Sequence, residues 1–335
     1  MELRKFGRTA LEVSVLGFGC GAVGGLMVRG NPSEQERAVA RALELGISFF
    51  DTAPTYGDGE SERNIGRILK NLKSNAFLGT KVWLPQVPRR GIADAVTSSL
   101  ETSLRRLGRN SVDLLQFHNP ITEAPRDDAL EASLVIDEIM PVFDRLRQQG
   151  KTRYCGITGL GDTSASLRVV GSRLFDTVQV AYNLLNPSAG ATTTSGLAGQ
   201  DFGELLRHAS EAGMGTIGIR SLAGGALSGV EARHPNGLPI VDAIGTADYP
   251  TDVHHAKIFQ PLVQEGHATS LVEAAIRYVI ANRVLTTAIV GYSSIEQLEF
   301  AAAAANKGPL TPGALERVTE LQRDLSANRD SASVA

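Results

Sequence analysis

FFDTAPTYG, at residues 49–57, is the stretch of this chain that carries the most structural information. A short apolar run ends at Asp51, and a turn containing Pro54 and Gly57 then presents Tyr56. In α/β folds the reactive groups gather at the carboxyl ends of parallel strands. The stretch therefore predicts a β/α unit whose strand end carries an acid and a phenol.

Two further strand ends supply groups of complementary chemistry. The run Leu78–Lys81 delivers an amine, Lys81, and the run Leu114–His118 delivers an imidazole, His118. If these strands are neighbours in one sheet, the four side chains converge on one site. Taken singly, each residue has an ordinary structural explanation, but four such residues at consecutive strand ends favour a catalytic site.

Apolar runs alternate with amphipathic helical patterns along the whole chain. The predicted strands are Val15–Gly19, Ser48–Asp51, Phe77–Lys81, Val112–His118, Thr152–Thr158, Thr177–Tyr182, Thr216–Ile219 and Thr286–Ile289. The predicted helices are Glu34–Leu45, Ser61–Leu69, Ile92–Leu107, Ile136–Gln149, Ser164–Val170, Phe202–Ala212, Leu271–Ala281 and Ile295–Ala305, the first with a capping box formed by Ser33 and Glu36. Eight β/α units favour a single (β/α)₈ TIM-type barrel domain over residues 1–335, with an open doubly wound sheet as the alternative.

Four segments do not fit the repeating unit. An N-terminal β-hairpin at about residues 3–13 is predicted to plug the bottom of the barrel, and Pro312–Ser326 is predicted as an extra C-terminal helix. A long loop at about residues 223–256 follows the seventh strand, where long loops are commonly functional. The polar tail at about residues 327–335 is expected to be disordered.

Composition excludes several classes of function. With 33 Lys and Arg against 36 Asp and Glu, the net charge is −3 and no basic block stands out, which argues against nucleic-acid binding. We find no secretory signal or apolar run of membrane-spanning length and expect no membrane attachment. Cys20 and Cys155 lie in separate predicted strands, as is typical of buried thiols in a reducing compartment. We therefore expect a cytoplasmic protein.

The four groups suit proton transfer to a carbonyl. A phenol has a pKa near 10, and an adjacent ammonium such as that of Lys81 lowers it. Asp51 would keep Lys81 charged and oriented, and His118 could polarise a substrate carbonyl by a hydrogen bond. On this hypothesis Tyr56 delivers the proton.

Three segments together resemble one known family. FFDTAPTYGDGESERNIGRIL around Asp51 and Tyr56, GTKV around Lys81 and LLQFHNP around His118 resemble the signature segments of the aldo-keto reductases, over about Leu3 to Ala305. The resemblance implies a (β/α)₈ barrel and NAD(P)(H)-dependent interconversion of an aldehyde, ketone or aldose with its alcohol. It implies that Tyr56 is the general acid/base, that Lys81 and Asp51 tune it and that His118 orients the carbonyl. The oligomeric state stays open.

The same resemblance places a nicotinamide cofactor. The string GCGAVG at residues 19–24 matches G-x-G-x-x-G, but no helix begins at its third glycine, so we interpret it as a loop at the barrel mouth. The cofactor contacts implied by the resemblance are Cys20, Gly21, Asp51, Thr158, Gln179, Arg220, Ser221, Leu222, Gly224, Gly291, Ser293 and Gln297. NADP(H) is favoured, with NAD(H) as the alternative. Tyr56, His118 and Trp83 are expected to meet the substrate.

The chain departs from the family pattern on the nucleotide side. Thr158 and Gly159 stand where many members carry Ser-Asn, and Ile219 or Arg220 stands where many members carry an aromatic residue. Phe300 and Ala301 replace the Glu-Asn pair that usually holds the adenosine.

Two alternative functions remain on the sequence alone. One is a nucleotide-binding regulatory subunit of the same fold with little turnover, because the fold includes partners of channel proteins. The other is a metal-dependent sugar isomerase, which the absence of clustered carboxylate and histidine ligands disfavours. His254 and His255 with Asp252 are interpreted as a surface loop, so no metal site is predicted.

Overall fold

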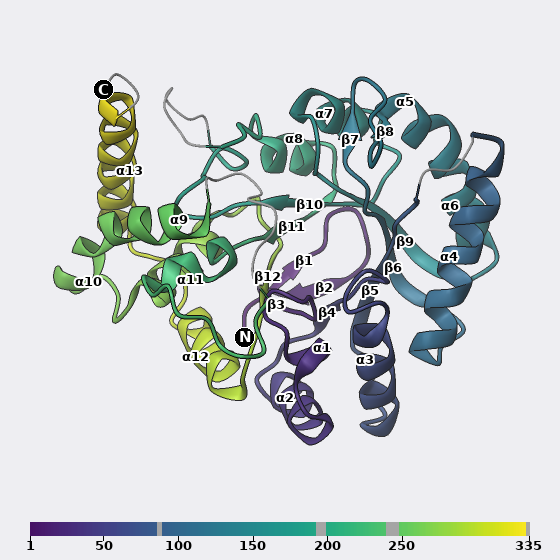
Figure 1. The fold of residues 1–335 in the computed structure, drawn as a ribbon, viewed down its shortest axis with the longest axis horizontal. Coiled ribbons are helices and arrows are strands. Elements are labelled where there is room, and N and C mark those ends of the chain that lie inside the picture. The colour runs from purple at the N-terminus through teal and green to yellow at the C-terminus, as the bar shows by residue number, and fades with distance from the viewer. Residues whose placement is uncertain (86–88, 192–198, 239–247, 333–335) are drawn as a thin grey trace.

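Eight parallel strands close into a barrel whose order follows the chain (Figure 1). This computed structural model describes every residue except 86–88, 192–198, 239–247 and 333–335, and no side chain after residue 326. The barrel strands are β3 (Leu16–Gly19), β4 (Phe49–Asp51), β5 (Phe77–Val82), β6 (Val112–Phe117), β9 (Thr152–Thr158), β10 (Thr177–Ala181), β11 (Gly215–Ile219) and β12 (Thr287–Gly291). Because β12 pairs with β3, the ring is closed and the open doubly wound sheet is excluded.

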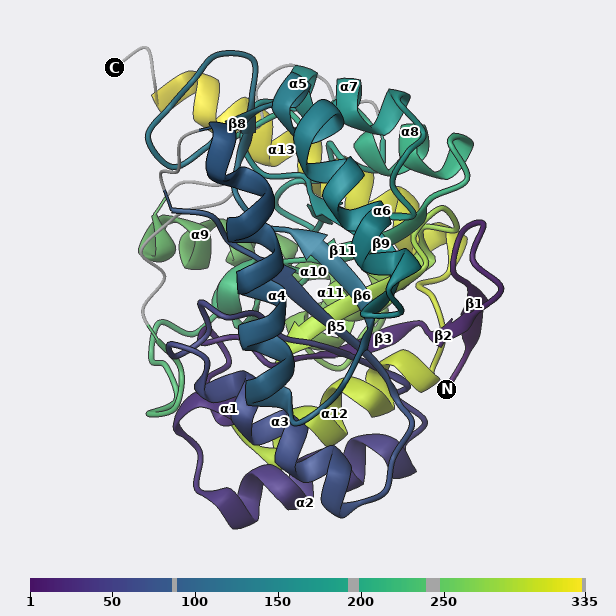
Figure 2. The same ribbon diagram turned by 90° about the vertical axis from the view of Figure 1, so that its right-hand side faces the viewer.

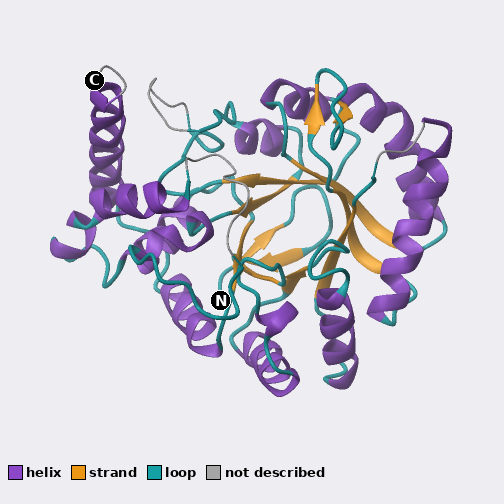
Figure 3. Ribbon diagram, in the orientation of Figure 1, coloured by secondary structure: helices purple, strands orange, loops and turns teal. Residues whose placement is uncertain are grey.

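Helices surround the ring of strands (Figure 3). They are α1 (Leu26–Arg29), α2 (Pro32–Glu44), α3 (Glu60–Asn71), α4 (Ile92–Leu107), α7 (Thr163–Gly171), α8 (Leu205–Glu211), α11 (Leu271–Ala281) and α12 (Ile295–Asn306). The short η1 (Arg89–Gly91) precedes α4. Between α4 and α7, α5 (Ala132–Leu134), η2 (Val135–Ile139) and α6 (Met140–Gln148) form one continuous helical run. Their buried apolar faces form one large cluster with the outward-facing strand residues. This layer fixes each strand end relative to its neighbours.

Two predicted helix starts are corrected by the structure. The capping box at Ser33 is wrong, because α2 begins at Pro32, two residues before the predicted start, and Asn31 caps it, its Oδ1 accepting from Glu34 N at 2.8 Å. Pro32 occupies the first helical turn, where its missing N–H costs nothing. The helix predicted from Ile136 begins at Ala132 and contains a π-helical turn, which a 3.6-residue pattern does not reveal.

The N-terminal hairpin closes one end of the barrel, as predicted. Its strands β1 (Leu3–Lys5) and β2 (Glu12–Ser14) pair antiparallel, and Figure 2 shows them at the end opposite α9 (Tyr249–Ala256). Phe6 from the hairpin turn is fully buried against Phe49 and Phe77, with ring centroids 6.0 and 5.6 Å away. Apolar side chains from the hairpin and the strands therefore fill this end of the barrel interior.

Segments outside the repeating unit are more ordered than the sequence indicated. Two-residue strands β7 (Ile121–Thr122) and β8 (Leu130–Glu131) pair beyond β6. The predicted loop at 223–256 contains η3 (Ala223–Ser228) and α9, followed by η4 (Lys257–Phe259) and α10 (Pro261–Gln264), while 239–247 lie outside the described residues. The tail expected to be disordered from residue 327 is helical as far as Ala332, because α13 runs over Pro312–Ala332. Among the described residues, no helix is both long and apolar enough to cross a membrane.

Candidate active site

The four residues singled out in the sequence meet at the open end of the barrel. Lys81, in β5, donates from Nζ to Asp51 Oδ2 at 2.6 Å and to the Tyr56 hydroxyl at 3.2 Å. Its third proton goes to the carbonyl of Thr52 at 2.9 Å. His118 directly follows β6, and its ring packs edge-on to Tyr56 with centroids 6.0 Å apart. The predicted convergence is thus present in the structure.

Two amides complete the shell around Asp51. Gln116 and Gln179 donate from their Nε2 atoms to Asp51 Oδ1 at 3.2 and 2.7 Å. Both carboxylate oxygens of Asp51 therefore have hydrogen-bond partners inside the barrel. Sequence reasoning missed Gln116, although a glutamine in an otherwise apolar strand at the same level as Lys81 was a usable signal.

Burial and charge together set the pKa values of this cluster. Burial alone would lower the pKa of Lys81, but Asp51 and Tyr56 outweigh it and raise the Lys81 pKa above its usual value. Burial raises the pKa of Tyr56, and the nearby Lys81 ammonium offsets this only in part. The expected fall in the Tyr56 pKa is therefore wrong for the cofactor-free site: the phenol is protonated at neutral pH, because desolvation outweighs one neighbouring cation.

His118 is a neutral imidazole in this site. Burial, followed by repulsion from the Lys81 ammonium, holds the pKa of His118 well below its usual range. Its Nδ1 is buried and has no hydrogen-bond partner within the described part of the chain. A neutral ring can donate one hydrogen bond to a carbonyl oxygen without bringing a second charge next to Lys81.

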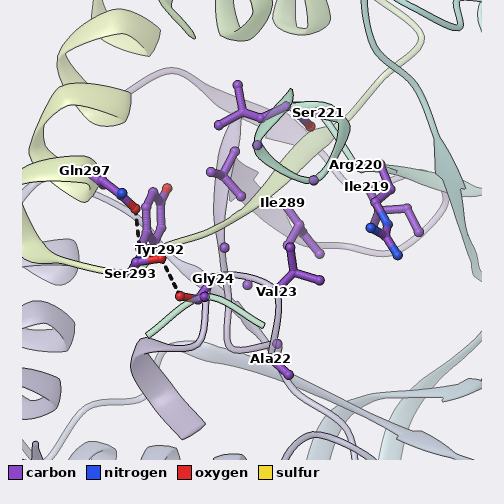
Figure 4. A pocket seen from close by; sticks show the side chains of 18 of the residues that line it. Ala22, Val23, Gly24, Ile219, Arg220, Ser221, Ile289, Tyr292, Ser293 and Gln297 are labelled. Atoms are coloured by element: carbon purple, nitrogen blue, oxygen red, sulfur yellow. Dashed lines mark hydrogen bonds between the residues drawn. The ribbon is translucent and has the colours of Figure 1, made fainter. Parts of the chain in front are cut away.

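The four residues lie beside a cavity of about 630 Å³ that runs along the barrel mouth toward α12. The predicted cofactor residues that line it are Gly21, Asp51, Thr158, Gln179, Arg220, Ser221, Leu222, Gly224, Gly291, Ser293 and Gln297, and Figure 4 shows Arg220 and Gln297 at opposite sides of it. Cys20 is not a lining residue: it is fully buried beneath the mouth, and burial raises the pKa of its thiol. Its predicted cofactor contact therefore stays a prediction that the cavity lining does not support.

Two predicted contacts have protein partners of their own. The Thr158 hydroxyl donates to the carbonyls of Phe117 and His118 at 3.1 and 3.3 Å, so it secures the end of β6 and offers a ligand only its lone pairs. Gln179 lines the cavity while its Nε2 donates to Asp51 Oδ1 at 2.7 Å. Both residues therefore link the catalytic cluster to the cavity wall.

The lining suits an extended nucleotide. Ser221 Oγ and the Tyr292 hydroxyl are buried and lack hydrogen-bond partners among the described residues, although both residues line the cavity. Gly24 allows the β3 loop to approach the end of β12, since a Cβ there would lie 2.4 Å from Tyr292 N. Backbone exposed by glycine and unpaired hydroxyls are the groups that phosphates and nucleosides use.

Sequence reasoning missed several lining residues. Arg233 donates to the carbonyl of Gly224 at 3.0 Å and to that of Val23 at 3.4 Å, and its guanidinium lies 4.8 Å from the Tyr249 ring centroid. It thereby holds the segment after β11 against the β3 loop. His234 and Glu296 also line the cavity, as does Phe300, which the sequence had already placed on the adenosine side. Such loop-to-loop contacts left no motif in the sequence.

Trp83 occupies a different place from the one expected. It does not line the cavity with the other residues, and its ring packs edge-on to His118, with centroids 5.7 Å apart. Its direct contact is therefore with the imidazole, and a substrate contact remains a prediction.

Comparison with known proteins agrees with this geometry. The aldo/keto reductase family model matches residues 15–323. The chain belongs to the aldo/keto reductase family. L-galactose dehydrogenase of Arabidopsis thaliana is 31% identical over 307 residues, covering 89% of this chain and 86% of that protein. The holo form of an aldo-keto reductase from Bacillus halodurans has a TM-score of 0.70 and 26% identity, covering 96% of both chains.

Membership in the aldo/keto reductase family gives the general activity, oxidoreduction of carbonyl compounds, and proteins of this family generally use NAD(P)H. Another relative is named a putative voltage-gated potassium channel subunit beta, from Schizosaccharomyces pombe, at 25% identity over 96% of this chain and 93% of that protein. Among the described residues, no group of three or more His, Cys, Asp or Glu side chains is placed to hold a metal ion.

Proposed function

We propose that this aldo/keto reductase interconverts an aldehyde, ketone or aldose with its alcohol, and that Tyr56 is the general acid/base. The observation that carries the proposal is the Lys81 ammonium, which bonds both Asp51 and Tyr56 beside the cavity. This arrangement gives the phenol a fixed position and a polarising neighbour, which is what proton delivery to a developing alkoxide requires.

Each residue of the cluster has a separate task. Tyr56 donates its proton to the carbonyl oxygen during reduction and removes it from the alcohol during oxidation. His118, kept neutral by burial, donates a hydrogen bond to the same oxygen and orients it. Lys81 stabilises the phenolate that forms when the proton leaves, and Asp51 keeps Lys81 charged.

The cavity residues would hold the cofactor. A bound nicotinamide would supply a hydride directly to the carbonyl carbon in reduction, or accept one from the alcohol carbon in oxidation. Ser221 and the glycines near it would face the pyrophosphate, and Gln297, with its neighbours on α12, would face the adenosine. The family resemblance favours NADP(H), and NAD(H) is the alternative. All four nicotinamide nucleotides therefore belong in the test.

The test is a kinetic screen of NADPH, NADP, NADH and NAD against aldehydes, ketones and aldoses. Tyr56→Phe should lower kcat by about 10²- to 10⁴-fold and leave nucleotide affinity unchanged, because it removes only the transferable proton. Tyr154→Phe, in β9, is the matched control and should behave as the wild type. Aldoses come first in the panel, since one relative is named L-galactose dehydrogenase.

A second outcome would favour a different role. If the protein binds nucleotide but turns over no carbonyl or alcohol, the enzymatic proposal fails and a nucleotide-binding regulatory subunit is favoured. The relative named as a channel subunit makes this the relevant competitor.

A further inference from the structure

Asn119 makes an unusual set of contacts next to His118. Its Oδ1 accepts from Leu84 N at 2.8 Å, and its Nδ2 donates to Leu84 O at 2.7 Å and to Asp128 O at 3.2 Å. Asn119 is fully buried, so these bonds are shielded from water. One side chain thus pairs with the backbone after β5 as a neighbouring strand would.

These bonds fix the backbone on both sides of Trp83. On one side, His118 N donates to Val82 O at 2.9 Å, a backbone hydrogen bond that joins the end of β6 to the end of β5. On the other side, Asn119 holds both polar groups of Leu84. Trp83 therefore sits between two fixed points, and its ring is held edge-on to the imidazole of His118.

The orientation of His118 depends on this packing. Catalytic histidines are commonly oriented by a hydrogen bond to the ring nitrogen that does not react. In this site Nδ1 has no such partner within the described ranges, and the ring instead lies between Tyr56 and Trp83, nearly perpendicular to both at 87° and 83°. Displacement of Trp83 would free the imidazole to rotate.

We propose that Asn119 is a positioning residue, which fixes Trp83 and through it the imidazole that orients the substrate carbonyl. The inference rests on the proposed function for its kinetic consequence, but the placement of Trp83 can be measured without turnover. The proposal explains why Asn119, a buried amide, makes these contacts although it lines neither the cofactor cavity nor the site of reaction.

Trp83 is the only tryptophan of the chain, so its fluorescence reports this position alone. In Asn119→Ala we expect a red-shifted emission, stronger quenching by acrylamide and a fall in kcat/KM of about tenfold, carried mainly by kcat, since small displacements of orienting groups are costly. Nucleotide affinity should not change. Asn186→Ala is the matched control: Asn186 is also buried and bonds loop backbone at Ser188 and Gln200, away from the cavity.

Asn119→Asp gives a second test, in which the side chain keeps its size and no void is left in the packing. At high pH its carboxylate faces the Leu84 carbonyl and repels it, whereas the protonated acid can donate there as Asn119 does. Because burial raises a carboxyl pKa, Trp83 emission in this variant should return toward the wild-type value as the pH falls from about 8 to about 5. Wild-type emission should stay constant over the same range.

Two results would overturn the proposal. The first is a folded Asn119→Ala with wild-type emission and kcat; the second is a fall in kcat with unchanged emission, which would mean that Asn119 acts by another route. If Asn119→Ala does not fold, the pH response of Asn119→Asp decides, and a flat response counts against the proposal. A protein with no carbonyl turnover would refute the proposed function, while the emission measurements would still decide the placement of Trp83.

Discussion

At the scale of single residues, the site combines a buried charge pair with a buried phenol. Asp51 and Lys81 are almost completely buried, and both oxygens and all three ammonium protons have partners. Burying such a pair is costly unless its hydrogen bonds are complete, so it is weak evidence for stability. Its position beside Tyr56 instead argues that the pair is retained for chemistry.

The pKa of Tyr56 predicts how activity depends on pH. Because burial raises this pKa, the phenol is fully protonated over about pH 6 to 9, and kcat/KM for reduction should not fall in that range on its account. Oxidation needs the deprotonated form, so its kcat/KM should rise with pH over the same range. Initial rates in both directions at saturating nucleotide would check this, and a loss of reduction already at pH 8 would contradict it.

Phe300 predicts a contribution to nucleotide binding. Its ring is 42% exposed, lies on α12 and lines the cavity, where an aromatic platform could stack on adenine. Phe300→Ala should weaken nucleotide binding about fivefold or more, as judged by titration of the protein with NADH and NADPH. Leu174→Ala, which removes another exposed apolar side chain, should leave the affinity unchanged. Unchanged affinity in both variants would exclude stacking on Phe300.

At the scale of elements, a buried carboxylate ties α11 to the segment between α12 and α13. Glu273 in α11 bonds Arg277 at 2.9 Å and Lys307 at 2.7 Å, and Arg277 also donates to the carbonyls of Gly308 and Pro309. Three helices that are separate in the sequence are thereby held together on one side of the barrel.

This cluster predicts a stability difference that depends on pH. Burial would raise the pKa of Glu273, but its bonds to Lys307, Thr269 and Arg277 outweigh this and hold the pKa at about 2. Because the pKa of Glu273 is lower in the folded than in the unfolded protein, its ionised carboxylate stabilises the fold at pH values above about 4.5, the unfolded pKa. This contribution is lost as the pH falls toward 2.

Glu273→Gln should therefore lower the free energy of unfolding by about 1 to 3 kcal/mol at pH 7 and by less at pH 3. Urea denaturation at the two pH values measures the difference. Glu316→Gln, at an exposed position on α13, is the control and should have little effect at either pH. Equal losses at both pH values for Glu273→Gln would show that its charge is not responsible.

At the scale of the whole molecule, the barrel separates stability from chemistry. The hairpin and its buried Phe6 close one end, and the catalytic cluster lies at the other. The parallel strands, from three residues in β4 to seven in β9, keep these two ends apart, so we expect a change at the floor to reach the mouth only through global unfolding.

Phe6→Ala tests this separation. Removing a fully buried phenylalanine should destabilise the protein by about 3 to 5 kcal/mol, and kcat of the folded protein should stay within twofold of the wild type. Thermal unfolding and activity at low temperature provide the two readings, with the exposed Leu3→Ala in the same hairpin as the control. A lost kcat without lost stability would show that floor and mouth are coupled.

Much of this arrangement could be predicted from the sequence because it is encoded locally. Apolar runs followed by a turn indicated all the barrel strands, and Asp51, Lys81 and His118 could be placed at strand ends from the same runs. Helix starts were less predictable, because Asn31 and Ser33 are equally good caps and only the position of Pro32 decides between them.

Sequence by itself therefore determined the barrel, the family and the convergence of four polar residues at one end of the barrel, since these follow from periodicity and from motifs within single β/α units. Only the tertiary structure decided that Cys20 lies beneath the cavity, that burial outweighs Lys81 in setting the Tyr56 pKa, and that Arg233 and Asn119 join separate loops. The physical reason is that desolvation and loop-to-loop hydrogen bonds depend on the packing of distant segments, which no local pattern of residues records.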